Sequence, residues 1–174
     1  MENIALVGFM GAGKSSVALL VARRLGFQVV DTDKMIEDEA GKTVEQIFAE
    51  DGENTFREWE RGVVKTLNQL SQTIISTGGG LVVDPANLQS LRRHSLVICL
   101  WASPETIWDR VRHQKHRPLL KGPNPLETIR RLLGSREKFY RQADALVNTD
   151  GRSTRQVAHQ VLHHYDLAAR DRSP

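Results

Sequence analysis

The chain has 174 residues, of which 40% are hydrophobic and 26% charged, and its one cysteine cannot form an internal disulfide. The net charge is only +3, no basic arm is present, and no apolar run approaches the roughly 20 residues that span a bilayer. We therefore expect a cytoplasmic monomer without nucleic-acid or membrane partners, built as one domain over residues 1–169 with a disordered tail over 170–174.

Short apolar runs alternate with helical patterns along the chain. The expected strands are 4–7, 27–30, 73–76, 96–101 and 145–148, the first two of them fully buried. The expected helices are 17–25, 34–40, 43–70 with a break near Asp51 and Gly52, 85–93, 104–112, 126–140 and 154–169. This alternation predicts an α/β fold of three layers, in which a five-stranded parallel sheet carries helices on both faces and binds ligands at the carboxyl ends of its strands.

One segment interrupts this alternation. Residues 113–125 read HQKHRPLLKGPNP, with three prolines. The segment is longer than a minimal connection, and long loops in compact domains are often lids, although a merely flexible loop remains the alternative. Arg117 lies within it, where a closing lid could bring its charge to a transferring phosphoryl group.

The first loop carries a phosphate-binding motif. Residues 8–15 read GFMGAGKS, which matches G-x-x-x-x-G-K-[ST] between an expected strand and an expected helix. Glycines let backbone N–H groups turn toward a phosphate, and the following helix presents its positive N-terminus. Lys14 is then expected to reach the β- and γ-phosphates, and Ser15 to ligate Mg²⁺.

Carboxylates follow the second expected strand, at Asp31 and Asp33. If the chain stays extended there, both side chains point into the cleft. Asp31 is then the candidate partner of Mg²⁺, and Asp33 is the candidate acceptor of a hydroxyl proton. Two alternatives remain open, namely that Asp33 caps the helix 34–40 and that Asp150, after the fifth strand, holds the metal instead.

Two arginines are placed where an anionic substrate could bind. Arg136 falls on the apolar stripe formed by Leu126, Ile129, Leu133 and Tyr140, and a cleft-facing guanidinium there needs an anion.

Arg57 has Glu60 one helical turn later to orient it. The glycines at 78–80 either form a tight turn or let backbone approach a ligand closely. Together with Asp33, these residues suit a small hydroxylated carboxylic acid, while ordinary salt bridges are the alternative for each arginine. The histidines at 159, 163 and 164 are read as a solvated helix face.

These motifs resemble those of the shikimate kinases along nearly the whole chain. The matching segments are GFMGAGKSS at 8–16, DTD at 31–33, FREWE at 56–60, STGGG at 76–80, RPLL at 117–120 and SREKFY at 135–140. The resemblance implies a nucleoside-monophosphate-kinase-like P-loop fold with a substrate-binding helical region at about 32–62 and a lid at about 112–125. It also implies that ATP phosphorylates shikimate to 3-phosphoshikimate, a step toward chorismate and aromatic amino acids.

The resemblance also implies roles for individual residues. ATP phosphates would be held by Gly11, Ala12, Gly13, Lys14, Ser15 and Ser16, and Mg²⁺ by Ser15 with Asp31. Shikimate would be bound by Asp33, Arg57, Gly78, Gly79, Gly80 and Arg136, with Lys14, Asp33 and Arg117 contributing to catalysis. Arg110 would stack on adenine. Arg152 would make a second nucleotide contact, although Thr154 stands where the family has a proline.

Other readings remain open beside this one. A gluconate kinase or a nucleoside monophosphate kinase would share the fold, and gluconate is also a polyol carboxylate. A nucleotide-binding module without turnover would need neither Asp33 nor an arginine on an apolar stripe. The sequence also leaves open whether Asp33 removes a proton or only orients the hydroxyl.

Overall fold

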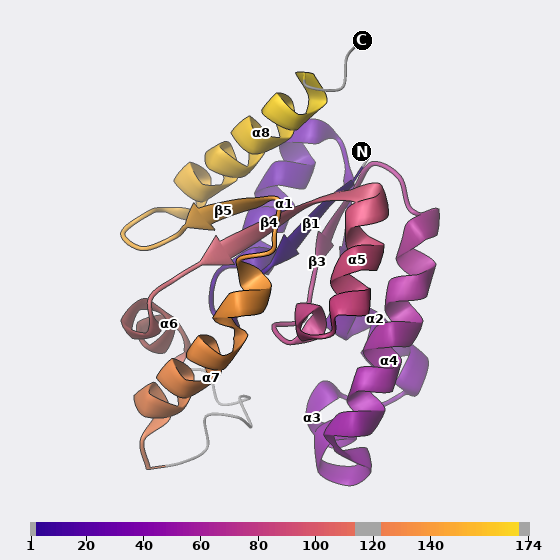
Figure 1. Cartoon of the computed structure of the whole chain (residues 1–174), viewed down its shortest axis with the longest axis vertical. Coiled ribbons are helices and arrows are strands. Elements are labelled where there is room, and N and C mark those ends of the chain that lie inside the picture. Colours follow the sequence, from indigo (N-terminus) through magenta and orange to yellow (C-terminus); the bar gives the residue numbers. More distant parts are fainter. Residues whose placement is uncertain (1–2, 114–122, 171–174) are drawn as a thin grey trace.

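A parallel sheet of five strands forms the centre of the protein (Figure 1). A computed structural model describes residues 3–113 and 123–170. The strand order is β2-β3-β1-β4-β5, and every pairing is parallel. The strands are β1 (Asn3–Val7), β2 (Gln28–Asp31), β3 (Thr73–Ser76), β4 (Ser95–Trp101) and β5 (Ala145–Asn148). The predicted five-stranded parallel sheet is thus confirmed, with strand ends within one residue of those expected.

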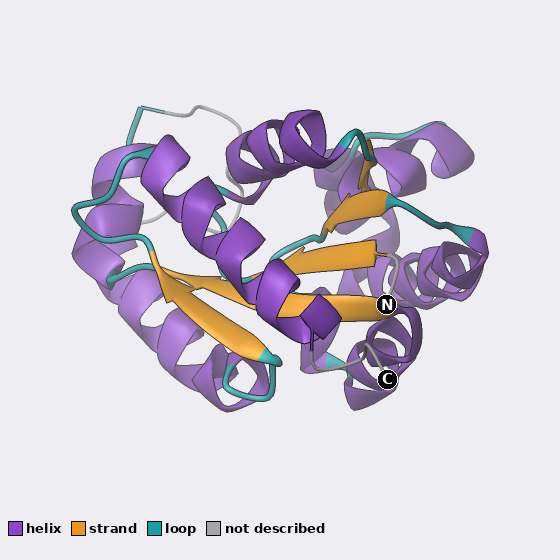
Figure 2. Cartoon of the chain, turned by 90° about the horizontal axis from the view of Figure 1, so that it is seen from above, coloured by secondary structure: helices purple, strands orange, loops and turns teal. Residues whose placement is uncertain are grey.

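Helices cover both faces of the sheet, as the sequence predicts (Figure 2). Alternate residues of β1 point to opposite faces of the sheet, and each face has its own hydrophobic core cluster. On the first face, Ile4 and Leu6 pack with α1 (Lys14–Leu25) and α8 (Thr154–Arg170). On the second face, Ala5 and Val7 belong to the other cluster. The helical elements on that second side include α2 (Thr32–Ala40), α4 (Gly52–Thr66), α5 (Pro85–His94), α6 (Pro104–Val111) and α7 (Pro125–Tyr140). Short turns complete the pattern: α3 (Val44–Gln46), η1 (Ile47–Asp51), η2 (Leu67–Gln69) and η3 (Leu81–Val83).

The position of each strand in the sheet decides how deeply it is buried. β1 lies in the middle and is buried along its whole length. β2 was expected to be fully buried, which is wrong, because β2 is an edge strand with Gln28 exposed and its other residues half-buried. Cys99 lies in β4 at 0% exposure, and burial raises the pKa of its thiol to about 12, so it is a small buried hydrophobe.

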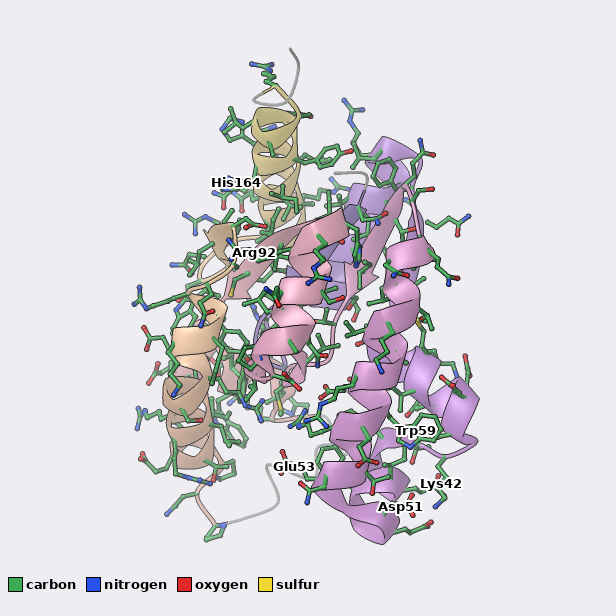
Figure 3. The ribbon with its side chains drawn as sticks, turned by 45° about the vertical axis from the view of Figure 1, so that its right-hand side comes forward. Lys42, Asp51, Glu53, Trp59, Arg92 and His164 are labelled. Carbon is green, nitrogen blue, oxygen red and sulfur yellow. The ribbon has the colours of Figure 1, made fainter. Side chains whose placement is uncertain are left out.

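The break expected near residue 51 is present. The turn η1 is π-helical and ends at Asp51, and Gly52 then takes a φ of 83° as α4 begins. Lys42 pairs with both acidic residues at this corner, since its ammonium lies 2.8 Å from Asp51 and 3.1 Å from Glu50. Figure 3 shows Lys42 beside Asp51. The helical segment expected over 43–70 therefore changes direction at its predicted break.

Some expected boundaries are wrong or lie outside the described residues. The helix expected at 17–25 begins at Lys14, and Arg170, expected in the disordered tail, ends α8. Residues 171–174 and most of the expected lid, with Arg117, lie outside the described residues. None of the helices in the described part of the chain is both long and apolar enough to cross a membrane.

Candidate active site

The loop between β1 and α1 has the backbone that a phosphate-binding loop needs. Gly8 and Gly13 take φ values of 133° and 97°, which side-chain-bearing residues rarely adopt. At Gly8, moreover, a Cβ would collide with the carbonyl oxygen of Leu100 in β4. Glycine is thus required at Gly8 both by conformation and by the closeness of the neighbouring strand.

The motif lysine lies folded across this loop. Lys14 is 8% exposed, and its ammonium donates hydrogen bonds to the carbonyl oxygens of Gly8 (2.8 Å) and Phe9 (2.9 Å). Its charge is therefore held at the loop where phosphates would bind.

The two residues predicted to hold Mg²⁺ meet each other. The Ser15 hydroxyl donates to Oδ2 of Asp31 at 3.3 Å, and it lies 3.3 Å from the Ser76 hydroxyl at the end of β3. Asp150, the alternative metal ligand, instead accepts hydrogen bonds from the Ser103 backbone N–H (2.9 Å) and hydroxyl (3.3 Å). Within the described residues, no cluster of three or more His, Cys, Asp or Glu side chains suits a metal ion. A hydroxyl and a carboxylate fit Mg²⁺, which usually completes its shell with phosphate oxygens and water.

Asp31 and Asp33 do not leave β2 on an extended chain, so that expectation is wrong. Helix α2 begins at Thr32, and Asp31 is its N-cap, with Oδ1 accepting from the backbone N–H groups of Asp33 (3.0 Å) and Lys34 (3.3 Å). The alternative that Asp33 caps this helix is therefore wrong as well. Asp33 instead lies half-buried in the cleft described next.

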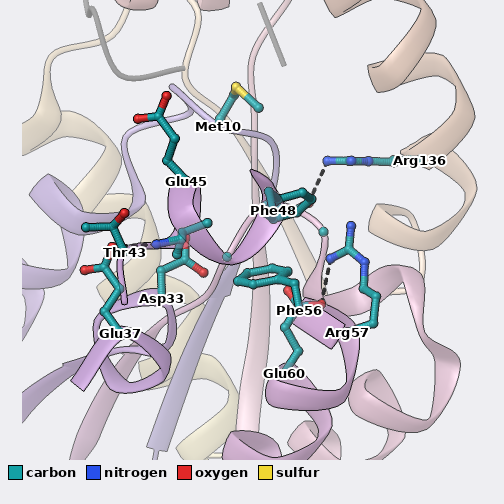
Figure 4. A pocket seen from close by; sticks show the side chains of 14 residues that line it. Met10, Asp33, Glu37, Thr43, Glu45, Phe48, Phe56, Arg57, Glu60 and Arg136 are labelled. Atoms are coloured by element: carbon teal, nitrogen blue, oxygen red, sulfur yellow. Dashed lines mark hydrogen bonds and ion pairs between the residues drawn. The ribbon is translucent and has the colours of Figure 1, made fainter. Parts of the chain in front are cut away.

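A cleft of about 450 Å³ lies beside the phosphate-binding loop (Figure 4). All six residues predicted to bind the substrate line it: Asp33, Arg57, Gly78, Gly79, Gly80 and Arg136. In Figure 4, Arg57 and Arg136 lie on one side of this space and Asp33 lies across from them. A Cβ at Gly78 would collide with Oδ1 of Asp33, so the glycine lets the carboxylate pack directly against backbone.

Arg57 is held by carboxylates at both ends of its guanidinium. Nη1 donates to Glu60 at 2.6 Å, as predicted, and Nη2 donates to Glu53 at 2.7 Å, which the sequence analysis missed. Glu60 is 1% exposed; burial raises the pKa of its carboxyl, and the Arg57 charge opposes that shift. A Cβ at Gly80 would lie 2.5 Å from Arg57 Nη1, so Gly80 leaves the space that the guanidinium fills.

Arg136 faces the cleft from α7, as its place on the apolar stripe predicts. Its guanidinium carbon lies 5.5 Å from the centroid of the Phe9 ring, and Nη1 makes a long 3.4 Å contact with the Gly79 carbonyl oxygen. Among the residues that the structure describes, no carboxylate forms an ion pair with Arg136. A half-buried cation in that position is suited to an anionic ligand.

Arg110 and Arg152 both lie near the end of β5. Arg110 donates to the Gly11 carbonyl (3.2 Å) in the phosphate-binding loop and to the Thr149 carbonyl (3.0 Å). Arg152 is exposed and donates to the Asn148 carbonyl at 2.6 Å. His164, by contrast, lies on α8 at the opposite end of the molecule from Glu53 (Figure 3).

Several lining residues were not predicted. They are Met10, Glu37, Thr43, Val44, Glu45, Phe48 and Phe56. The rings of Phe48 and Phe56 are tilted against each other at 4.7 Å. Phe48 lies in the π-helical turn η1, which shifts the helical phase, so a period of 3.6 residues cannot place it on the cleft.

A phosphate-binding loop beside a cleft with two arginines and a carboxylate defines a P-loop kinase of a small anionic molecule. A model of the shikimate kinase family matches residues 10–166. The chain therefore belongs to the shikimate kinase family.

Similar proteins agree with this assignment. A shikimate kinase of Symbiobacterium thermophilum is 46% identical over 163 residues, which covers 92% of this chain and 94% of the relative. One from Thermodesulfovibrio yellowstonii is 39% identical over 166 residues, covering 95% and 96% respectively.

Solved structures extend the comparison to the fold. The structure of a shikimate kinase from Acinetobacter baumannii in complex with shikimate has a TM-score of 0.91 and 33% identity, covering 100% of this chain and 96% of the other. A gluconokinase from Sinorhizobium meliloti, at 15% identity and a TM-score of 0.62, shares the fold alone.

Replacing Gly80 with alanine should displace the Arg57 guanidinium and leave the buried Glu60 carboxylate poorly paired. We expect the free energy of unfolding to fall by about 1–3 kcal/mol, measured by urea denaturation. The matched control is Gly62→Ala on α4, where an added Cβ meets open space; it should be neutral or stabilising by up to ~1 kcal/mol. Equal midpoints for the two variants would contradict the tight fit at Gly80.

Proposed function

We propose that this chain transfers the γ-phosphoryl group of ATP to a hydroxyl of shikimate, with residues 11–16 holding ATP and the cleft holding shikimate. The observation that carries the proposal is Arg136, a half-buried cation in a cleft beside the phosphate-binding loop that forms no ion pair with any carboxylate of the described residues. Family membership and the shikimate-bound relative from Acinetobacter baumannii support it.

The cleft suits shikimate in size and charge. A volume of about 450 Å³ is in the range of small-ligand sites. Arg57 and Arg136 together bind the carboxylate, because a guanidinium matches a carboxylate with two parallel hydrogen bonds. Arg57 is already fixed by Glu53 and Glu60, so it needs little reorganisation when the substrate arrives.

Asp33 orients the hydroxyl that is phosphorylated. Its carboxylate lies across the cleft from the arginines, so a molecule gripped at its carboxylate presents hydroxyls to Asp33. Because the phosphoryl-transfer transition state is loose, the main contribution of Asp33 is positioning, and it takes the proton as the new P–O bond forms.

Ser15 and Asp31 would hold Mg²⁺ together with phosphate oxygens and water. The bound cation would neutralise charge on the β- and γ-phosphates during transfer. Lys14 stabilises the same phosphates from the loop, Arg110 and Arg152 contact the nucleoside end, and Arg117, outside the described residues, meets the transferring group.

The direct test of the substrate is ADP release from Mg-ATP with shikimate, gluconate, AMP or CMP added separately. We expect ADP only with shikimate. ADP with gluconate or a nucleotide would keep the kinase and overturn the roles of Arg57 and Arg136. Folded protein that binds ATP but releases no ADP with any acceptor would instead indicate a module without turnover.

Asp33→Asn should lower kcat by about 100-fold or more while the ATP dissociation constant stays within about twofold, because the carboxylate acts on the acceptor and not on the nucleotide. Steady-state kinetics and isothermal titration with ATP measure the two quantities. Asp38→Asn, an exposed carboxylate on the same helix, is the control and should resemble the parent. A large loss of ATP affinity in Asp33→Asn would move Asp33 to the metal site.

Asp31→Asn separates the metal role of Asp31 from its capping role. Asparagine caps helices as well as aspartate does, so the fold should persist while the Mg²⁺ concentration for half-maximal activity rises by about tenfold or more. Asp84→Asn at the N-cap of α5 makes the same change away from the cleft and should leave the Mg²⁺ dependence unaltered. An unchanged Mg²⁺ titration of Asp31→Asn would show that Asp31 is a cap alone.

A further inference from the structure

The last residue of α7, Tyr140, is hydrogen-bonded to Gly79, which lines the cleft. Tyr140 is 1% exposed, and its hydroxyl donates a hydrogen bond of 2.5 Å to the Gly79 carbonyl oxygen. Burial raises the pKa of Tyr140 to about 12, although both the charge of Arg136 and a hydrogen bond from it oppose that shift. The hydroxyl therefore keeps its proton at neutral pH and remains a donor.

The same carbonyl oxygen is the acceptor for Arg136. Arg136 lies one helical turn before Tyr140, and its Nη1 stands 3.4 Å from that oxygen, beyond the usual range of a good hydrogen bond. Tyr140 therefore makes the short bond and Arg136 the long one. Since a guanidinium carries five N–H donors, most of those of Arg136 remain available to a ligand.

The carbonyl belongs to a peptide that has little room to move. A Cβ at Gly79 would lie 3.2 Å from the backbone nitrogen of Met10, so this turn packs closely against the phosphate-binding loop. The carbonyl of Gly79 and the N–H of Gly80 belong to one trans peptide and point in opposite directions. A bond that draws the carbonyl toward α7 thus turns the Gly80 N–H away from α7.

We infer that Tyr140 is a positioning residue of the acceptor site, whose hydroxyl holds the Gly79 carbonyl and so keeps the Arg136 guanidinium available to the acceptor carboxylate. The inference rests on the proposed function, in which Arg136 binds that carboxylate. Without the hydroxyl, the carbonyl loses its short bond and Arg136 is the donor at hand to replace it. Shikimate would then have to break a new Arg136–Gly79 bond before it could bind.

The test is Tyr140→Phe, which removes one oxygen and keeps the buried ring. We expect the shikimate KM to rise by about tenfold, while kcat stays within about threefold and the ATP KM within about twofold. The chain's other tyrosine supplies the matched control: Tyr165 lies on α8 against Phe27, outside the cleft lining, and Tyr165→Phe should leave all three constants unchanged. A fall in kcat with an unchanged shikimate KM would overturn the inference.

A double-mutant cycle with Arg136→Lys tests whether Tyr140 acts through Arg136. In the Arg136→Lys background, Tyr140→Phe should raise the shikimate KM by less than about twofold, because coupled residues are not additive. A full tenfold effect in both backgrounds would overturn the route through Arg136. If Arg136→Lys alone leaves the shikimate KM unchanged, the proposed role of Arg136 fails. If Arg136→Lys raises that KM and Tyr140→Phe does not, only the inference about Tyr140 fails.

Discussion

Two glycine-containing loops meet at the carboxyl ends of β1 and β3, and the site depends on that contact. The strands are paired in parallel, with Leu6 opposite Ser76, and the Thr77 N–H and hydroxyl both bond to the Leu6 carbonyl oxygen at 3.1 and 3.0 Å. The phosphate-binding loop and the turn at 78–80 therefore leave the sheet side by side. Their backbones come so close that a Cβ at Gly79 would lie only 3.2 Å from the backbone nitrogen of Met10.

Under the proposed function, this contact would join the site of the phosphoryl donor to the site of the acceptor. Arg136 spans them, since its guanidinium lies over the ring of Phe9 in the nucleotide loop and beside the carbonyl of Gly79 in the acceptor turn. A carboxylate that binds Arg136 must therefore be accommodated directly next to the loop that would hold ATP. Fixed separation of donor and acceptor is what phosphoryl transfer most requires from a protein.

The sequence predicts those parts of the site that have a local signature. The loop at 8–15 is a contiguous motif, the five strands are contiguous apolar runs, and Arg136 breaks a helical stripe that can be counted. Contacts across the chain are not visible in this way. Tyr140 was read as a member of the apolar stripe because its ring is apolar, and the carbonyl that its hydroxyl meets is 61 residues away. The sequence predicts that Asp33 lies in the cleft and Asp31 near Ser15, which is where the structure has them. It predicts the wrong backbone, because the chain does not stay extended and helix α2 starts between the two residues.

The two arginines of the cleft differ in how their charges are paired with carboxylates of the described residues. Arg57 is fixed by ion pairs with two carboxylates, Glu53 and Glu60, which offset its positive charge. Under the proposed function, it would therefore orient the acceptor and add no net positive charge. Arg136 forms no ion pair with a described carboxylate, so under the proposed function it would supply the positive charge that the acceptor carboxylate needs. An acceptor that lacks a carboxylate would leave Arg136 half-buried without an anion, and a site built around such a group rejects ligands that cannot pair with it. Under the proposed function, selectivity for an anionic acceptor would thus come from Arg136, and the orientation of that acceptor would come from Arg57.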